Sequence, residues 1–249
     1  MIVTVCEFDR SPNEDEALWE AFAAHVQVEK SDLVLLPEMP FYRWLAARKL
    51  VDQSAWEAAA AAHDRWLGRL PELGAEVVVS SRPVIRDGKN LNEGYFWDKD
   101  SGYQAVHHKY YLPDEEDYWE ATWYERGNGQ DFDIVQTSSA RLGFLICTEL
   151  WFTHHGRHYA KEGIELLVCP RATPASTTDK WIAGGRAAAV VSGAFCMSSN
   201  YEGTGGWIIE PQEGEVLGTT SPDRPFLTLD INLEEAHKAK STYPRYVLD

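Results

Sequence analysis

The chain has 249 residues, of which 44% are hydrophobic and 25% are charged, as in an ordinary globular protein. Its 23 basic and 39 acidic residues give a net charge of −16, and such a surface repels phosphate backbones, so we expect no nucleic-acid partner. The start, residues 1–5, lacks the basic segment of a signal peptide, and no apolar run reaches the roughly 18 residues of a membrane span, so we expect no membrane partner.

The first half of the chain alternates predicted strands and helices. Three apolar segments predict buried strands: residues 1–5, 33–36 and 77–79. Ser11-Pro12-Asn13-Glu14 predicts the start of a first helix, because Ser11 can cap it and Glu14 can close a capping box. Ser54 and Glu57 predict the start of a second helix by the same device.

The second half continues this alternation. Residues 95–97 and 103–107 flank a polar turn and predict a hairpin. The later patterns predict strands at 142–147, 164–169, 195–199, 207–210 and 226–231, and helices at 154–162 and 179–191. This order predicts an α/β fold with a mixed sheet, in a single domain that spans residues 1–249. The acidic and aromatic stretch 113–129 predicts a long functional loop.

Three segments each place one reactive side chain at or just past the end of a strand. They present a carboxylate at Glu38, an amine at Lys109 and a thiol at Cys147. Because ligands gather outside the carboxyl ends of strands in open α/β sheets, the three side chains could converge on one pocket. Taken singly, each has a structural explanation: a solvated acid, a surface charge and a buried small hydrophobic residue.

The order Glu38, Lys109, Cys147 in these contexts resembles the nitrilase, or carbon–nitrogen hydrolase, superfamily. Further segments resemble strands of that family: residues 1–8, 80–83, 92–97, 163–170 and 206–214. The resemblance implies a four-layer α-β-β-α sandwich with Glu38 as general base, Lys109 as electrostatic stabiliser and Cys147 as nucleophile. It also implies a second catalytic glutamate, for which Glu120 matches better than Glu125.

This constellation suits hydrolysis of a C–N bond. A free thiol, with a pKa of about 8.5, is mostly protonated at neutral pH, so a carboxylate can take its proton as it attacks a carbonyl carbon. Lys109 and the backbone N–H of Thr148 could hold the negative charge that develops on the substrate oxygen. A helix dipole behind Cys147 would favour its thiolate. We expect a small amide or N-carbamoyl substrate, a thioester intermediate, release of ammonia and no metal or organic cofactor.

Several residues near these segments are candidates for the walls of a small aromatic pocket. They are Thr148 and four aromatic side chains, Trp119, Trp123, Tyr124 and Trp151. Arg171, just past another strand, could bind a substrate carboxylate or form an internal salt bridge. The resemblance also implies at least a homodimer, paired through the helices after Cys147, with an apolar patch of Trp151, Phe152, His155 and Tyr159.

Other functions remain alternatives. A nitrilase acting on a C≡N group suits the same triad, although Cys147-Thr148-Glu149 differs from the Cys-Trp-Glu form of true nitrilases. An inactive scaffold of the same fold is a further alternative, whereas a papain-like pairing of Cys147 with a histidine lacks the local cysteine motif of that family. His154, His158 and Glu162 have the spacing of a metal face, but a solvated helix start explains them better. Gly203-Thr204-Gly205-Gly206 predicts a tight turn rather than a phosphate loop, since no helix follows it.

The four cysteines are Cys6, Cys147, Cys169 and Cys196. They are scattered rather than paired, which argues against a disulfide framework and against a zinc motif. A reducing cytoplasm is the simplest location for such a chain.

Overall fold

The structure, a computed structural model, describes residues 1–201 and 205–247, so Gly203 and Thr204 of the expected tight turn lie outside the described residues. Its strands are β1 (Ile2–Phe8), β2 (Leu33–Leu35), β3 (Val77–Arg86), β4 (Lys89–Asp98), β5 (Gly102–His108), β6 (Val135–Gln136), β7 (Arg141–Phe144), β8 (Leu166–Ala172), β9 (Phe195–Tyr201), β10 (Trp207–Ile209), β11 (Val216–Thr219) and β12 (Phe226–Asp230). Its α-helices are α1 (Glu16–Glu29), α2 (Gln53–Leu67), α3 (Glu120–Trp123), α4 (Thr153–Lys161), α5 (Thr178–Ser192) and α6 (Glu234–Ala239). Short 3₁₀ helices are η1 (Leu70–Leu73), η2 (Cys147–Trp151) and η3 (Ala175–Thr177).

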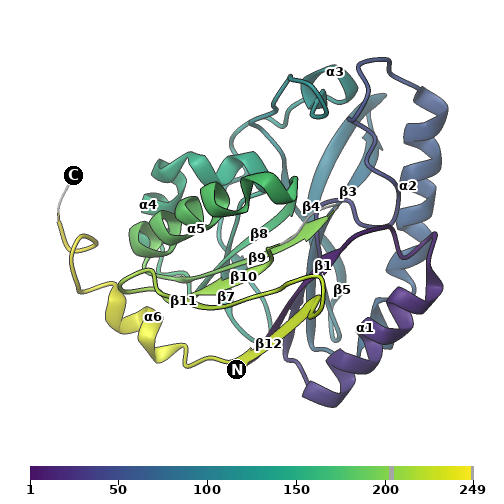
Figure 1. The fold of residues 1–249 in the computed structure, drawn as a ribbon. Coiled ribbons are helices and arrows are strands. Elements are labelled where there is room, and N and C mark those ends of the chain that lie inside the picture. Colours follow the sequence, from purple (N-terminus) through teal and green to yellow (C-terminus); the bar gives the residue numbers. More distant parts are fainter. Residues whose placement is uncertain (202–204, 248–249) are drawn as a thin grey trace.

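Two sheets form the centre of the molecule. The first runs in the order β12-β1-β2-β3-β4-β5, and the second in the order β11-β10-β9-β8-β7-β6. The two meet where the end of β1 pairs with the end of β9, at Glu7–Asn200 and Phe8–Tyr201. Helices α1 and α2 cover the outer face of the first sheet, and α4 and α5 cover that of the second (Figure 1). The predicted four-layer α-β-β-α sandwich is confirmed.

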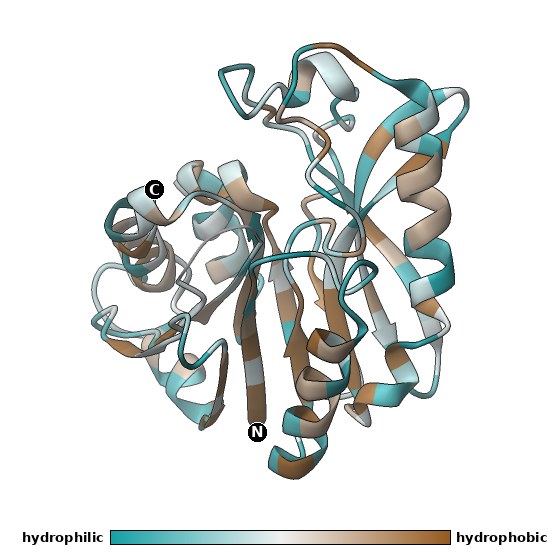
Figure 2. Ribbon diagram, turned by 45° about the vertical axis from the view of Figure 1, so that its right-hand side comes forward, coloured by the Kyte–Doolittle hydropathy of each residue, from teal (hydrophilic) through white to brown (hydrophobic). Residues whose placement is uncertain are grey.

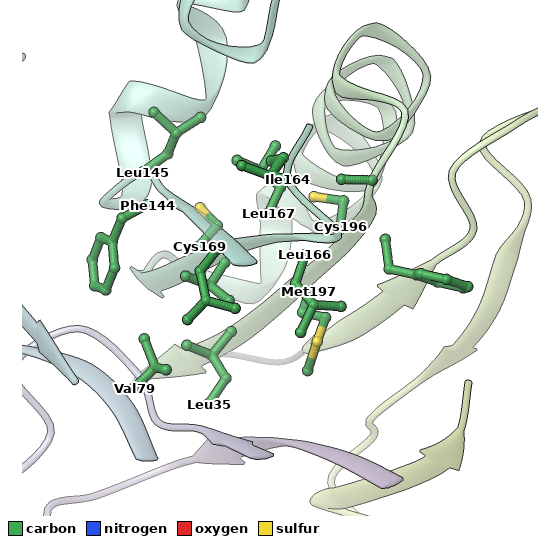
Figure 3. Packing of buried hydrophobic residues seen from close by; sticks show 14 of the residues in the cluster. Leu35, Val79, Phe144, Leu145, Ile164, Leu166, Leu167, Cys169, Cys196 and Met197 are labelled. Atoms are coloured by element: carbon green, nitrogen blue, oxygen red, sulfur yellow. The ribbon is translucent and has the colours of Figure 1, made fainter. Parts of the chain in front are cut away.

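The core follows from the alternation of side chains along the strands. In β2, Leu33 and Leu35 face the second sheet, whereas Val34 points to the layer of α1 and α2. Figure 3 shows Leu35 and Val79 opposite the side chains of Phe144 and Cys169. The strands are accordingly the most apolar segments, with polar residues gathered on the outer helix faces and loops (Figure 2). These buried strands hold the residues that follow them in fixed positions.

Both predicted helix starts need correction. Ser11 forms a separate turn, in which its carbonyl accepts the amide of Glu14 at 2.9 Å, and helix α1 begins only at Glu16. Helix α2 is capped by Asp52, whose side chain accepts the amide of Ala55 at 3.2 Å. At α2 a carboxylate two residues before the expected cap takes the backbone amide, whereas the N-cap of α1, Asp15, makes no side-chain capping hydrogen bond.

The other predicted elements are present within a few residues. Strands β6 and β11 and helices α3 and α6 were not predicted, and the half-exposed side chains of β11 give a weak pattern. Within residues 1–201 and 205–247, no helix combines the length and the apolar character needed to cross a membrane.

Candidate active site

Glu38 lies three residues past the end of β2, at the junction of the two sheets. Its backbone N–H donates to the carbonyl of Arg171 in β8 at 3.2 Å. The next residue, Met39, adopts a left-handed φ of 43° and donates its N–H to the carbonyl of Ser81 at 3.2 Å. Backbone bonds to both sheets therefore fix where this carboxylate points.

Lys109 follows β5 directly and lies between two carboxylates. Its backbone is bound on both sides, because its N–H donates to the carbonyl of Asn92 and its own carbonyl accepts the amide of Gly127, each at 2.9 Å. Its Nζ lies 2.7 Å from Glu38 Oε1 and 2.6 Å from Glu120 Oε2. The side chains of all three residues are at most 1% exposed, so one cation balances two acids in a dry site.

The charges of this cluster depend on one another. Burial alone would lower the pKa of Lys109, but the carboxylates of Glu120 and Glu38 outweigh it and hold that pKa well above its usual value. Burial raises the pKa of Glu120, although Lys109 opposes the rise. Lys109 is therefore a fixed ammonium, and Tyr124 donates a hydrogen bond to Glu120 Oε2, the same oxygen that contacts Lys109.

The two oxygens of Glu38 differ. Oε1 accepts Lys109 and also the amide of Asn92, whose Nδ2 lies 2.8 Å away. Oε2 is buried and has no hydrogen-bond partner among the described residues. A buried carboxylate oxygen without a donor is the atom best able to take up a proton.

Cys147 begins η2 just after β7, with a left-handed φ of 49°. Only 3% of it is exposed, and burial raises its pKa to about 12, with Glu38 adding to the rise and Lys109 opposing it. The expected dipole-favoured thiolate is thus wrong for the resting protein, because a five-residue 3₁₀ helix offsets neither burial nor two acids. The thiol is neutral until a base removes its proton.

Glu149, two residues after Cys147, joins the segments that carry Lys109 and Cys147. Its Oε1 accepts the amide of Tyr110 at 2.7 Å, and its Oε2 accepts the amide of Ile146 at 2.8 Å. It is fully buried and also lies 2.8 Å from a ring nitrogen of His107. Sequence reasoning missed this role, although the position of Glu149 beside Cys147 was a usable signal.

A cavity of about 600 Å³ lies outside the buried cluster. It is lined mainly by aromatic and apolar side chains and by two charged ones: Tyr110, Tyr111, Leu112, Pro113, Ala121, Tyr124, Glu125, Arg126, Thr148 and Phe152. Thr148 follows Cys147, and Tyr124 binds Glu120, so these two residues connect the cavity with the cluster.

A profile of the carbon–nitrogen hydrolase family matches residues 6–240. The chain belongs to this family. A citrullinase from Francisella tularensis is 26% identical over 176 residues, or 68% of this chain and 60% of that protein. An N-carbamoylputrescine amidase from Solanum tuberosum is 30% identical over 108 residues, or 43% of this chain and 35% of that protein. The matched regions thus span only about a third to three fifths of these relatives.

Two solved structures resemble this chain over nearly its whole length. A carbon–nitrogen hydrolase from Helicobacter pylori superposes with a TM-score of 0.86 over 98% of this chain and 94% of the other, at 18% identity. An amidase from Nesterenkonia sp. AN1 superposes with a TM-score of 0.77 over 95% of both chains, at 19% identity. At these identities the likeness shows the nitrilase fold alone.

Arg171 of this family member lies in the core, outside the lining of the cavity. Its three nitrogens donate to Ser198 Oγ at 2.7 Å, Thr173 Oγ1 at 2.6 Å and the carbonyl of Gly205 at 2.5 Å. Its guanidinium also stands 4.1 Å from the ring centroid of Trp207, and burial lowers its pKa to about 10. Both expectations for Arg171 need correction, because neutral oxygens, not a substrate carboxylate or an acidic partner, satisfy it.

Three predicted wall residues also lie elsewhere, and one of them, Trp119, packs under the ammonium of Lys49, whose Nζ lies 4.3 Å from the ring centroid. Trp123 is 5% exposed, with its Nε1 donating to the carbonyl of Arg48, and Trp151 packs on Trp181 with ring centroids 5.2 Å apart. None of the three lines the cavity beside the cluster, whose aromatic wall residues are tyrosines and Phe152 instead. In the described part of this family member, no three His, Cys, Asp or Glu side chains gather as a metal site would require.

Proposed function

We propose that the chain hydrolyses the C–N bond of a small linear amide or N-carbamoyl compound, through a thioester on Cys147 and with release of ammonia. The observation that carries the proposal is the fixed ammonium of Lys109 between Glu38 and Glu120, with Glu38 Oε2 left without a donor. Such a set supplies a base and a positive charge beside a thiol that cannot ionise alone.

The first half of the reaction forms the thioester. Cys147 Sγ bonds to the carbonyl carbon of the substrate while its proton passes to Glu38 Oε2. The negative charge that builds on the substrate oxygen is stabilised by Lys109 and by the N–H of Thr148. As the tetrahedral intermediate collapses, the C–N bond breaks and Glu38 returns the proton to nitrogen, so that ammonia leaves.

The second half restores the enzyme. Glu38 takes a proton from a water molecule as that water attacks the thioester carbon, and the C–S bond then breaks. The acyl group leaves as an acid, and the sulfur recovers its proton from Glu38. Glu120 keeps Lys109 in place and charged in both halves, and Tyr124 holds Glu120.

The relatives support the choice of bond. Two of them are named for ureide chemistry, as a citrullinase and an N-carbamoylputrescine amidase. The amidase from Nesterenkonia sp. AN1 is described with the acetamide moiety of fluoroacetamide covalently bound at its active-site cysteine. A nucleophilic cysteine in that amidase agrees with the role of nucleophile that we propose for Cys147.

The test is ammonia release by the purified protein from a panel of small amides, N-carbamoyl compounds and nitriles, with citrulline and N-carbamoylputrescine included. We expect release from at least one amide or carbamoyl compound, and none from the Cys147→Ala variant. Conversion of nitriles with amides untouched would overturn the reaction class. No release from any compound would favour the inactive scaffold instead.

We also propose that the chain forms a homodimer through α4 and α5, which lie side by side on the outer surface (Figure 1). Trp151 is 39% exposed and supports this face. Tyr159 must be removed from the expected patch, because it is fully buried and donates to the carbonyl of Phe144 at 3.0 Å. Light scattering at micromolar concentration tests the proposal, and a monomeric mass would contradict it.

A further inference from the structure

The two charged residues on the cavity wall differ in whether a side chain of opposite charge lies beside them. Of the side chains that line the cavity, only Glu125 and Arg126 carry a full charge at neutral pH. Glu125 Oε2 lies 3.0 Å from Nζ of Lys89, a residue outside the lining. The negative charge of Glu125 is therefore already balanced by a cation that does not reach the cavity.

Arg126 has no such acidic partner among the described residues. Its guanidinium carbon stands 5.1 Å from the ring centroid of Tyr110, which belongs to the same wall. Other arginines of the described residues, such as Arg65 and Arg224, also lack an acidic partner, but they do not line this cavity. In a chain with 39 acidic and 23 basic residues, a guanidinium that faces a cavity without a carboxylate is positioned to receive one.

The neighbouring acidic run does not fill this role. Residues 114–117 are absent from the cavity lining, and Asp114 Oδ1 accepts a hydrogen bond from Thr122 Oγ1 at 2.8 Å. The ring of Tyr110 holds the guanidinium by its face, which leaves the N–H edges of Arg126 open for a planar anion. Thr148, next to Cys147, marks the part of the same cavity where the scissile bond would lie.

We propose that Arg126 recognises a carboxylate at the end of the substrate remote from the scissile C–N bond, so that the preferred substrate is an amide or carbamoyl compound of an organic acid. This inference rests on the proposed function for the position of the scissile bond. It moves the recognition of an anion from Arg171, which is enclosed by protein oxygens, to a residue on the cavity wall.

Three amides of equal chain length test the proposal. Succinamate ends in a carboxylate, butyramide in a methyl group and β-alaninamide in an ammonium. We expect kcat/KM to be highest for succinamate and lowest for β-alaninamide. Because this contact is exposed, the preference for succinamate should shrink as salt is raised from about 0.01 to 1 M.

The variant Arg126→Ala should raise the KM for succinamate about ten-fold with little change in kcat, because the contact is the same in ground and transition states. Its KM for butyramide should stay within about two-fold, and Arg126→Lys should restore part of the difference. Lys99→Ala, which removes an equal exposed charge whose partner Glu76 also lies outside the cavity lining, is the matched control and should not change the ratio of the two substrates.

Binding measured by calorimetry on the Cys147→Ala protein separates this inference from the proposed function, since it needs no turnover. Tighter binding of succinamate than of butyramide, lost in Cys147→Ala/Arg126→Ala, would support the inference even if no amide were hydrolysed. Equal binding of the two compounds, or an equal loss for both in the double variant, would overturn it, even if both were hydrolysed.

Discussion

The buried cluster around Lys109 and the cavity wall outside it are built in different ways. The cluster stands at the ends of strands, where the backbones of Glu38 and Lys109 are tied to neighbouring strands and their side chains are fully buried. Much of the wall comes from the stretch between β5 and β6, in which α3 is the only regular helix of the described residues. Sheets that fix a reacting group to a few tenths of an ångström suit chemistry, whereas a loop can vary to suit a substrate.

The contrast between a catalytic cluster and a substrate-binding wall requires that the reaction occur at the cluster. Cys147→Ala should lower kcat by a factor on the order of 10⁴ to 10⁶, because no other group replaces the nucleophile. Cys169→Ala is the matched control, since Cys169 is equally buried and its Sγ lies 3.9 Å from the carbonyl of Cys147. Ammonia release with a soluble, folded protein measures both, and full activity in Cys147→Ala would sink the mechanism.

A second test concerns the fixed charge. Lys109→Ala should lower kcat about 10²- to 10³-fold, as expected for the loss of an electrostatic stabiliser. It should also destabilise the protein by about 3–5 kcal/mol, because Glu38 and Glu120 remain buried without their cation. Activity assays with urea unfolding measure the two effects. Lys89→Ala, which removes an exposed cation, should change neither by much, and a near-normal rate in Lys109→Ala would remove Lys109 from the site.

A third test asks whether catalysis needs Glu149, which joins the segments that carry Lys109 and Cys147. Glu149→Gln keeps the shape of the side chain but brings an NH₂ group toward one of the two amides, Tyr110 N–H or Ile146 N–H. We expect kcat to fall about 10- to 100-fold and stability to fall by about 1–3 kcal/mol. Glu125→Gln on the exposed wall is the control. An unchanged kcat with lowered stability would show that Glu149 supports the fold but does not position the reacting groups.

The sequence predicted the cluster better than the wall for a physical reason. Glu38 and Cys147 each follow an apolar run typical of a buried strand, and Lys109 follows the second strand of a predicted hairpin, so the pattern predicted that each would lie near a strand end. The wall follows no period. Trp151 and Trp123 are near the site in sequence, yet they pack on Trp181 and against Arg48, since large aromatic rings fill whatever core is closest.

Arg171 and Cys147 show what a strand pattern leaves open. The pattern placed Arg171 at a strand end, but only the structure reveals the neutral oxygens of Ser198 and Gly205 that enclose it. Likewise, the start of a helix suggested a thiolate at Cys147, whereas burial and two nearby carboxylates decide its charge. Both depend on contacts between residues distant in the sequence, which local patterns do not encode.

The ion pairs of His107 with Glu149 and Asp131 should make the stability of the protein depend on pH. Burial alone would lower the pKa of His107, but Glu149 and Asp131 outweigh it and raise that pKa to about 10. A raised pKa means that the stabilisation is complete below the unfolded value of about 6.5 and is lost as pH rises toward 10. Native protein should therefore exceed His107→Gln in stability at pH 6, and the gap should narrow by on the order of 1–2 kcal/mol between pH 7 and 9.

The comparison uses the difference in unfolding free energy between native protein and variant at each pH. In this difference the contributions of titrating groups far from His107 cancel, including that of Lys240, whose pKa burial lowers to about 7. Urea unfolding at several pH values supplies the measurement. A gap that stays constant from pH 6 to 10 would mean that folding does not raise the pKa of His107.

The smallest effect is expected at two adjacent residues, Trp151 and Phe152, of which only Phe152 lines the cavity. Phe152 lines the cavity, whereas Trp151 packs on Trp181 and is 39% exposed. Phe152→Ala should therefore change the KM of a good substrate several-fold by removing apolar wall area, at about 25 cal/mol per Å² lost. Trp151→Ala should leave KM within about two-fold and cost stability instead, because its ring covers Gly184 of α5. Steady-state kinetics on both variants measure the two KM values. A larger KM change in Trp151→Ala than in Phe152→Ala would show that Trp151 contacts the substrate, as the sequence predicted.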